Sequence, residues 1–106
     1  MLPAAEIFRT LADPTRVAIY DCIARQEMTV SEIKGRFPVS QPAISQHLAI
    51  LRRAGLASER RAGRHVHYRA DPAGLKPMIR WLEYHQAFWH ERMPRLKAVL
   101  KEMKDE

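Results

Sequence analysis

The spacing of apolar residues changes close to Gly55, and this change limits the folds open to the chain. Before Gly55, apolar residues recur every three or four positions, as they do on one face of a helix. After it, residues 56–62 and 64–70 read as two strands around Ala62 and Gly63, and apolar and cationic side chains alternate in the second strand. Helical spacing returns after residue 71. The sequence therefore predicts a mainly α-helical fold with a small β-hairpin.

Capping signals divide the first half of the chain into four helices. Asp13 is a favourable N-cap residue, and the proline that follows it suits the first helical position. Thr29 and Glu32 have the spacing of a capping box, and Ser40 is the next N-cap. Gly55 is expected to follow the fourth helix in the left-handed conformation. The predicted helices cover about 2–12, 14–25, 30–37 and 40–54, and a fifth helix follows residue 71.

The predicted last helix carries apolar residues at intervals of seven, from Leu75 to Met103. A heptad spacing held over five positions is typical of a helix that pairs with another helix. We interpret this seam as a homodimer interface, whereas packing of Trp81 and Trp89 inside the monomer is the alternative. Pro94 is expected to kink or split the helix. The predicted interface residues are Leu75, Ile79, Leu82, Trp89, Met93 and Leu96.

Positive charge is concentrated in one segment. The net charge is +6, and the segment from Arg52 to Arg69 supplies +5 of it, with six arginines and Glu59 as its only acid. A basic segment of this kind favours an anionic partner such as double-stranded DNA, although a solvated basic surface would show the same composition.

The helix predicted at 40–54 has an outer arc of small, polar and cationic residues without any acid. Small side chains let a helix enter the major groove, where Gln and Ser can bind base edges. The tip of the hairpin at 57–70 is expected to contact a phosphate or the minor groove. The alternative for the helix at 40–54 is an ordinary amphipathic surface helix that does not bind DNA. The predicted DNA-binding residues are Ser40, Gln41, Pro42, Ser45, Gln46, His47, Arg52, Arg53, Arg60, Arg61, Arg64 and His65.

Length and composition limit the other classes of protein. At 106 residues the chain is expected to form one domain over 1–106, and one cysteine excludes an intramolecular disulfide. We find neither an apolar segment long enough to cross a membrane nor a signal peptide, so we expect a cytoplasmic protein without a membrane partner. Catalytic motifs are also missing, which predicts that the protein is not an enzyme.

Three motifs resemble those of the ArsR/SmtB family of bacterial winged-helix repressors. They are LADPTR at 11–16, SQPAISQHL at 40–48 and RRAGR at 60–64, and the resemblance covers about residues 4–100. It implies a winged helix-turn-helix of order α-α-α-α-β-β-α that dimerises through its first and last helices. It also implies a sequence-specific repressor that binds an inverted-repeat operator and releases it on a signal.

The chain departs from this family at its known metal sites. Thr29 and Ser31 stand where the third helix of metal sensors carries Cys-x-Cys, and the last helix lacks the Asp-x-His and His-x-x-Glu pairs. Hydroxyl groups are poor ligands for thiophilic metals. We therefore place the chain in a subgroup without the known metal ligands and expect no metal and no other cofactor. A site that two subunits share through His85, His90 and Glu91 remains an alternative.

The sequence leaves the inducing signal open between an unidentified small molecule and a redox signal sensed by Cys22. The apolar surroundings predicted for Cys22 favour a small core residue over a sensor. A winged helix that binds another protein instead of DNA is the second functional hypothesis.

Overall fold

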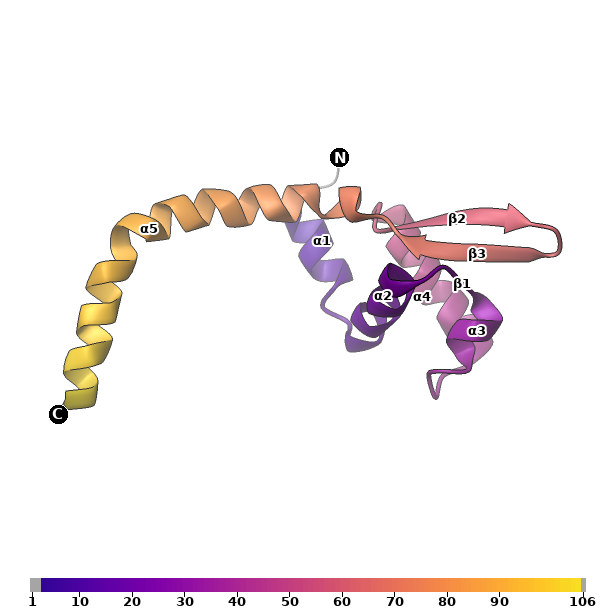
Figure 1. Cartoon of the computed structure of the whole chain (residues 1–106), viewed down its shortest axis with the longest axis horizontal. Helices are drawn as coiled ribbons and strands as arrows, with labels where there is room; N and C mark the ends of the chain where they lie inside the picture. The colour runs from indigo at the N-terminus through magenta and orange to yellow at the C-terminus, as the bar shows by residue number, and fades with distance from the viewer. Residues whose placement is uncertain (1–2, 106) are drawn as a thin grey trace.

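The computed structural model describes residues 3–105, and for residues 90, 91, 93, 95–97, 104 and 105 it describes the backbone alone. Figure 1 shows a helical body from which a long hairpin and a long terminal helix extend. In chain order the elements are α1 (Ala4–Thr10), α2 (Pro14–Arg25), β1 (Met28–Thr29), α3 (Val30–Lys34), α4 (Gln41–Arg53), β2 (Ala57–Ala62), β3 (His65–Ala70), the 3₁₀ turn η1 (Pro72–Leu75) and α5 (Lys76–Asp105).

This order confirms the predicted winged helix-turn-helix, with one addition to the sheet. The short strand β1 pairs antiparallel with β3, so the sheet has three strands in the order β1-β3-β2. The sequence predicted only the hairpin, because Thr29 was read as the N-cap of α3 and not also as a strand residue. It is both: it lies opposite His67 in the sheet and caps α3 with its side chain.

Each predicted cap that starts a helix is formed. The carboxylate of Asp13 accepts hydrogen bonds from the backbone N–H groups of Thr15 and Arg16, at 2.8 and 3.3 Å. Thr29 and Glu32 form a complete capping box at α3. These contacts join residues only two or three positions apart, which is why the sequence was sufficient to predict them.

Gly55 ends α4 as predicted. It has a φ of +77°, and its N–H donates to the carbonyl of Arg52 at 3.0 Å. The N–H of Leu56 donates to the carbonyl of Leu51 at 2.9 Å, which completes a Schellman motif. The two leucines are fully buried. The motif fixes the direction in which the chain leaves α4 and enters the wing.

The core lies between the first four helices and the base of the sheet. Its fully buried side chains are Ile7, Ile19, Ile23, Met28, Ile33, Ile44, Leu48, Leu51 and Leu56. Three of them, Ile44, Leu48 and Leu51, come from α4, as its apolar spacing predicted. Burial of this face turns the opposite arc of α4 outward.

The wing is the hairpin of β2 and β3. Ala62 pairs with His65, so the turn consists of Gly63 and Arg64, one residue later than predicted. Gly63 has a φ of +63°, and positive φ at the first turn residue only is typical of a type II′ turn. Because such turns follow the natural twist of the strands, the wing extends as a regular ribbon away from the body (Figure 1).

Helix α5 begins on the body and then leaves it. Leu75 and Met78 pack against the core, and the contacts of α5 with other helices are made mainly with α1. Further along, the helix bends (Figure 1), and it runs on through Pro94 as one element, so the split that was one of the two expectations for Pro94 does not occur. None of the helices described here is long and apolar enough to span a membrane.

Candidate nucleic-acid interface

The polar and cationic residues on the outer arc of α4 are exposed. Burial of the opposite face explains this, and the helix contains no acidic residue that would repel a phosphate. Seven of the predicted DNA-binding residues lie here, and all are solvent-exposed: Ser40, Gln41, Pro42, Ser45, Gln46, Arg52 and Arg53. Ser40 also caps the helix, because its Oγ accepts a hydrogen bond from the N–H of Ala43 at 3.3 Å. The hydroxyl of Ser40 can still donate its own proton.

His47 lies elsewhere on the helix. Its side chain is half-buried, and its Nδ1 is enclosed without a hydrogen-bond partner. The spacing of His47, three residues after Ile44 and four before Leu51, would have predicted this place beside the core. A DNA contact by His47 stays a prediction, and the ring is partly turned toward the protein.

Asp13 is the charged group that faces His47 from the N-terminus of α2. Partial burial raises the pKa of Asp13, but the hydrogen bonds from the backbone of Arg16 and Thr15 outweigh it and hold this pKa below its ordinary 3.8. The charges of Arg16 and His47 act in the same direction. The carboxylate is therefore ionised and fixed as the cap of α2.

The wing carries exposed cations at its tip. Arg61, Arg64 and His65 are all exposed, and DNA contact by them stays a prediction. Arg69 lies nearer the body and donates from its Nε to the Oγ of Ser58 at 3.2 Å. Arg64 lies in the two-residue turn, Arg61 lies opposite Val66 close to that end of the ribbon, and the turn itself contains no acidic residue.

Two of the predicted DNA-binding arginines are held by carboxylates. Arg52 Nη1 lies 2.6 Å from Glu59 Oε1, and Arg60 Nε lies 2.8 Å from Glu27 Oε1. Glu27 was missed in the sequence because it is 33 positions from its partner. The folded sheet brings them together, and no local pattern would have found this pair.

The predicted interface residues lie in η1 and α5 and fall into three groups. Leu75 is half-buried against the core. Ile79, Leu82 and Trp89 are 42%, 48% and 45% exposed, and together they give α5 a row of exposed large apolar side chains. The side chains of Met93 and Leu96 are outside the described residues.

Trp81 joins α5 to α1. Its ring packs edge-on against Phe8, with centroids 5.3 Å apart, and lies 4.2 Å from the ring of His85. Trp81 is nevertheless 44% exposed, so it is not a residue of the monomer core. The paired aromatic rings form an apolar surface shared by the first and last helices.

The candidate sensor residues are dispersed. Thr29 is engaged in its capping box, and His85 lies between the rings of Trp81 and Tyr84. Among the residues described, no group of three His, Cys, Asp or Glu could hold a metal ion. The side chains of His90 and Glu91 lie outside that set, so a site shared across a dimer stays a hypothesis. Cys22 packs half-buried beside the core.

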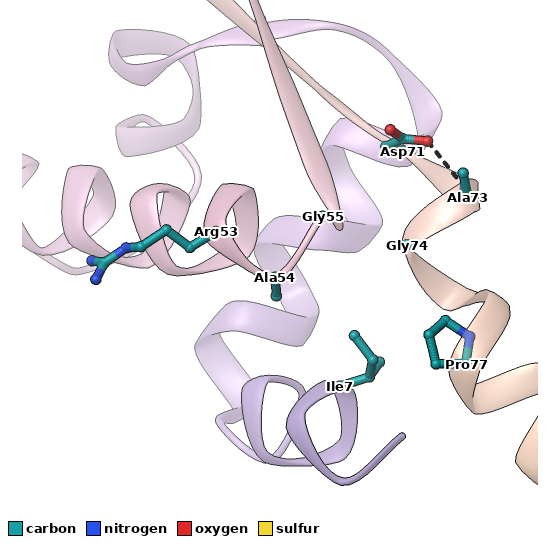
Figure 2. Close-up of a pocket in the computed structure, with 8 residues that line it drawn as sticks. All are labelled: Ile7, Arg53, Ala54, Gly55, Asp71, Ala73, Gly74 and Pro77. Atoms are coloured by element: carbon teal, nitrogen blue, oxygen red, sulfur yellow. Dashed lines mark hydrogen bonds between the residues drawn. The ribbon is translucent and has the colours of Figure 1, made fainter. Parts of the chain in front are cut away.

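A cavity of about 420 Å³ lies where α1, the end of α4 and η1 meet. Its lining residues are Ile7, Arg53, Ala54, Gly55, Asp71, Ala73, Gly74 and Pro77 (Figure 2). The side chain of Arg53 extends away from the cavity, and Asp71 accepts a hydrogen bond from the N–H of Ala73 at 3.0 Å. Neither of these charged side chains is placed to contact a ligand in the cavity.

A helix-turn-helix with an acid-free outer arc on its second helix, followed by a basic two-stranded wing, defines a winged-helix DNA-binding protein. Comparison with known proteins gives the family. The family model described as "Bacterial regulatory protein, arsR family" matches residues 13–59. The chain is 36% identical over 76 residues to the transcriptional repressor SdpR of Bacillus subtilis, which covers 72% of this chain and 84% of SdpR. The chain belongs to the ArsR family.

Two further comparisons agree. The arsenical resistance operon repressor of Escherichia coli is 41% identical over 68 residues, which is 63% of this chain and 58% of that protein. The solved structure of an ArsR-like transcriptional regulator from Rhodococcus sp. RHA1 has a TM-score of 0.75 at 35% identity, with 91% of each chain covered. The protein is therefore a DNA-binding transcriptional regulator.

Proposed function

We propose that this protein is a homodimeric transcriptional repressor that binds an inverted-repeat operator and is not an enzyme. The observation that carries the proposal is the exposed, acid-free arc of α4 beside the cationic tip of the wing. SdpR and the Escherichia coli relative are both named as repressors, which supports repression over activation.

The two DNA-contacting elements have different tasks. The arc of α4 enters the major groove, where Gln41, Ser45 and Gln46 can hydrogen-bond base edges. Arg61 and Arg64 at the tip of the wing bind phosphates or the minor groove, which adds affinity but little sequence information. The body holds the two elements at a fixed angle through the Schellman motif at Gly55.

The apolar surface of α5 is the proposed dimer interface. Leu82 and Trp89 lie seven residues apart and are nearly half exposed, as expected for a seam that a second helix covers. Phe8 and Trp81 continue this surface onto α1. A second copy of the chain is the natural occupant, because a two-fold axis presents the same heptad seam from both sides. The dimer would place two α4 helices at half-sites about one turn of DNA apart.

Two alternatives differ from this proposal in their measurable behaviour. A winged helix that binds a protein would show a weak dependence on salt, whereas phosphate contacts release counterions and give a steep one. A repressor that senses oxidation through Cys22 would lose DNA binding on mild oxidation. Half-burial of Cys22 beside the core favours a packing role over a sensing one.

The test begins with selection of binding sites from a random duplex pool by the full chain. We expect an inverted repeat, two chains per duplex and a steep loss of affinity between low and moderate salt. A shuffled duplex of equal length is the control. No enrichment of any sequence, or equal affinity for the selected and shuffled duplexes, would contradict a sequence-specific regulator. One chain per selected duplex would contradict the dimer alone.

A further inference from the structure

The base of the wing contains a carboxylate that is directed at a DNA-binding cation. Glu59 lies on β2, and its Oε1 is 2.6 Å from Nη1 of Arg52 in the last turn of α4. Both side chains remain partly exposed, at 34% for Glu59 and 48% for Arg52. The pair therefore lies at the surface, within reach of a ligand that approaches α4 and the wing together.

Glu59 is fixed from a second side. It lies opposite Tyr68 in the register of β2 and β3. Burial raises the pKa of Tyr68, and the negative charge of Glu59 and a hydrogen bond with its carboxylate raise it further. A carboxylate that both Arg52 and Tyr68 contact has a defined position between α4 and β3. It is not a loose surface acid.

Arg52 shares the outer arc of α4 with Ser45. The two residues are seven positions apart, which is close to two helical turns, so they lie on one side of the helix. A phosphate beside the groove that Ser45 faces would compete with Glu59 for the guanidinium of Arg52. By contrast, Arg61 and Arg64 at the tip have no acidic partner among the ion pairs of the described residues.

We propose that Glu59 is a specificity-determining residue, because its ion pair with Arg52 withholds that cation from the phosphates of arbitrary DNA and holds the wing in register with α4. On arbitrary DNA the pair stays closed, and Arg52 adds little non-specific affinity. On the operator the same pair keeps the base of the wing aligned while α4 is seated in the groove. This inference rests on the proposed DNA-binding function.

Glu59→Gln tests the proposal, since it removes the charge and keeps the shape of the side chain. Freed Arg52 can bind one more phosphate, so affinity for a shuffled duplex should rise about five- to tenfold at ~0.1 M salt. The slope of log K against log salt should steepen by about 0.9. Affinity for the selected operator should change less, because the gained contact is offset by the loosened wing. The ratio of operator to shuffled affinity therefore falls several-fold.

Two controls separate the release of Arg52 from a mere change in net charge and from an effect through another residue. Asp21→Asn removes the same charge from an exposed position on α2 and should leave both the ratio and the slope unchanged. In an Arg52→Gln background, Glu59→Gln should no longer strengthen binding to the shuffled duplex. The urea midpoint should barely move in Glu59→Gln, because an exposed ion pair contributes little to the global free energy of unfolding, even where it aligns the wing locally.

Each other outcome overturns the proposal. An equal gain on both duplexes would show a general electrostatic effect, and a loss on both would show a merely structural role. An effect that persists without Arg52 would assign it to another group. If the wild-type chain binds no duplex at all, the proposed function fails, whereas normal wild-type binding with an unchanged Glu59→Gln variant refutes this inference alone.

Discussion

Replacement of Gly74 by alanine should destabilise the fold, because Gly74 lies directly against the backbone of Gly55. A Cβ added at Gly74 would be 2.1 Å from the carbonyl oxygen of Gly55 and 2.5 Å from its carbonyl carbon. Both are more than 0.8 Å inside ordinary van der Waals contact, which begins at about 3.4 Å. Both atoms belong to the backbone, so a side-chain rotation cannot relieve the overlap.

Relief requires η1 to move away from the end of α4. That shift would strain the hydrogen bond from the N–H of Asp71 to the carbonyl of Leu56, now 2.8 Å, and lift Leu75 from the core. Overpacking of this kind costs about 1–3 kcal/mol. A weakened hydrogen bond adds about 1 kcal/mol. We therefore expect the free energy of unfolding to fall by roughly 2–4 kcal/mol, a large share of the stability of a small protein.

Urea denaturation followed by circular dichroism, at one fixed protein concentration, measures this change. Gly35→Ala is the matched control, because its φ is −64° and an added Cβ would be 3.4 Å from the nearest atom. That variant should be neutral or stabilised by up to about 1 kcal/mol. If Gly74→Ala unfolds within about 0.5 kcal/mol of the wild type, the argument from the close approach of the two backbones is wrong.

Four further predictions address the interface, the acid stability and the DNA contacts. Leu82→Glu should give folded monomers by sedimentation, because a buried unpaired carboxylate would cost the dimer several kcal/mol. Tyr84→Glu, on the opposite side of α5, should remain dimeric. A monomeric wild-type protein would refute the proposed interface. Asp13→Asn should make the free energy of unfolding fall less steeply in acid. The lowered pKa of Asp13 means that its carboxylate stabilises the fold above pH ~4, and this contribution disappears as pH falls through that lowered pKa. If plots of unfolding free energy against pH run parallel for the variant and the wild type from pH 6 to 2, the prediction is wrong. Ser45→Ala should cost about 1–3 kcal/mol of binding mainly at the selected operator, and equal losses on shuffled DNA would exclude base readout. Arg64→Ala should weaken binding to every duplex and reduce the salt slope by about one, so an unchanged slope would remove Arg64 from the phosphate contacts.

Local patterns in the chain are sufficient to predict the helices of the body and the buried face of α4. The N-caps at Asp13, Thr29 and Ser40 and the left-handed Gly55 depend on neighbours within a few residues, so their patterns are visible in the chain. The apolar spacing of α4 fixed which face is buried, and therefore which face is exposed to solvent. The concentration of arginine likewise predicted a cationic wing.

The contacts that join distant segments depend on how the whole chain folds. The strand β1 exists because two residues before α3 meet β3, about 40 positions later, and two residues carry no periodicity of their own. The pairing of Arg60 with Glu27 and the approach of Gly74 to Gly55 have the same origin. The path of the chain brings these groups together, and their partners cannot be read from local spacing. For that reason the sequence located the cations of the wing, but only the folded chain showed which of these cations form ion pairs with carboxylates.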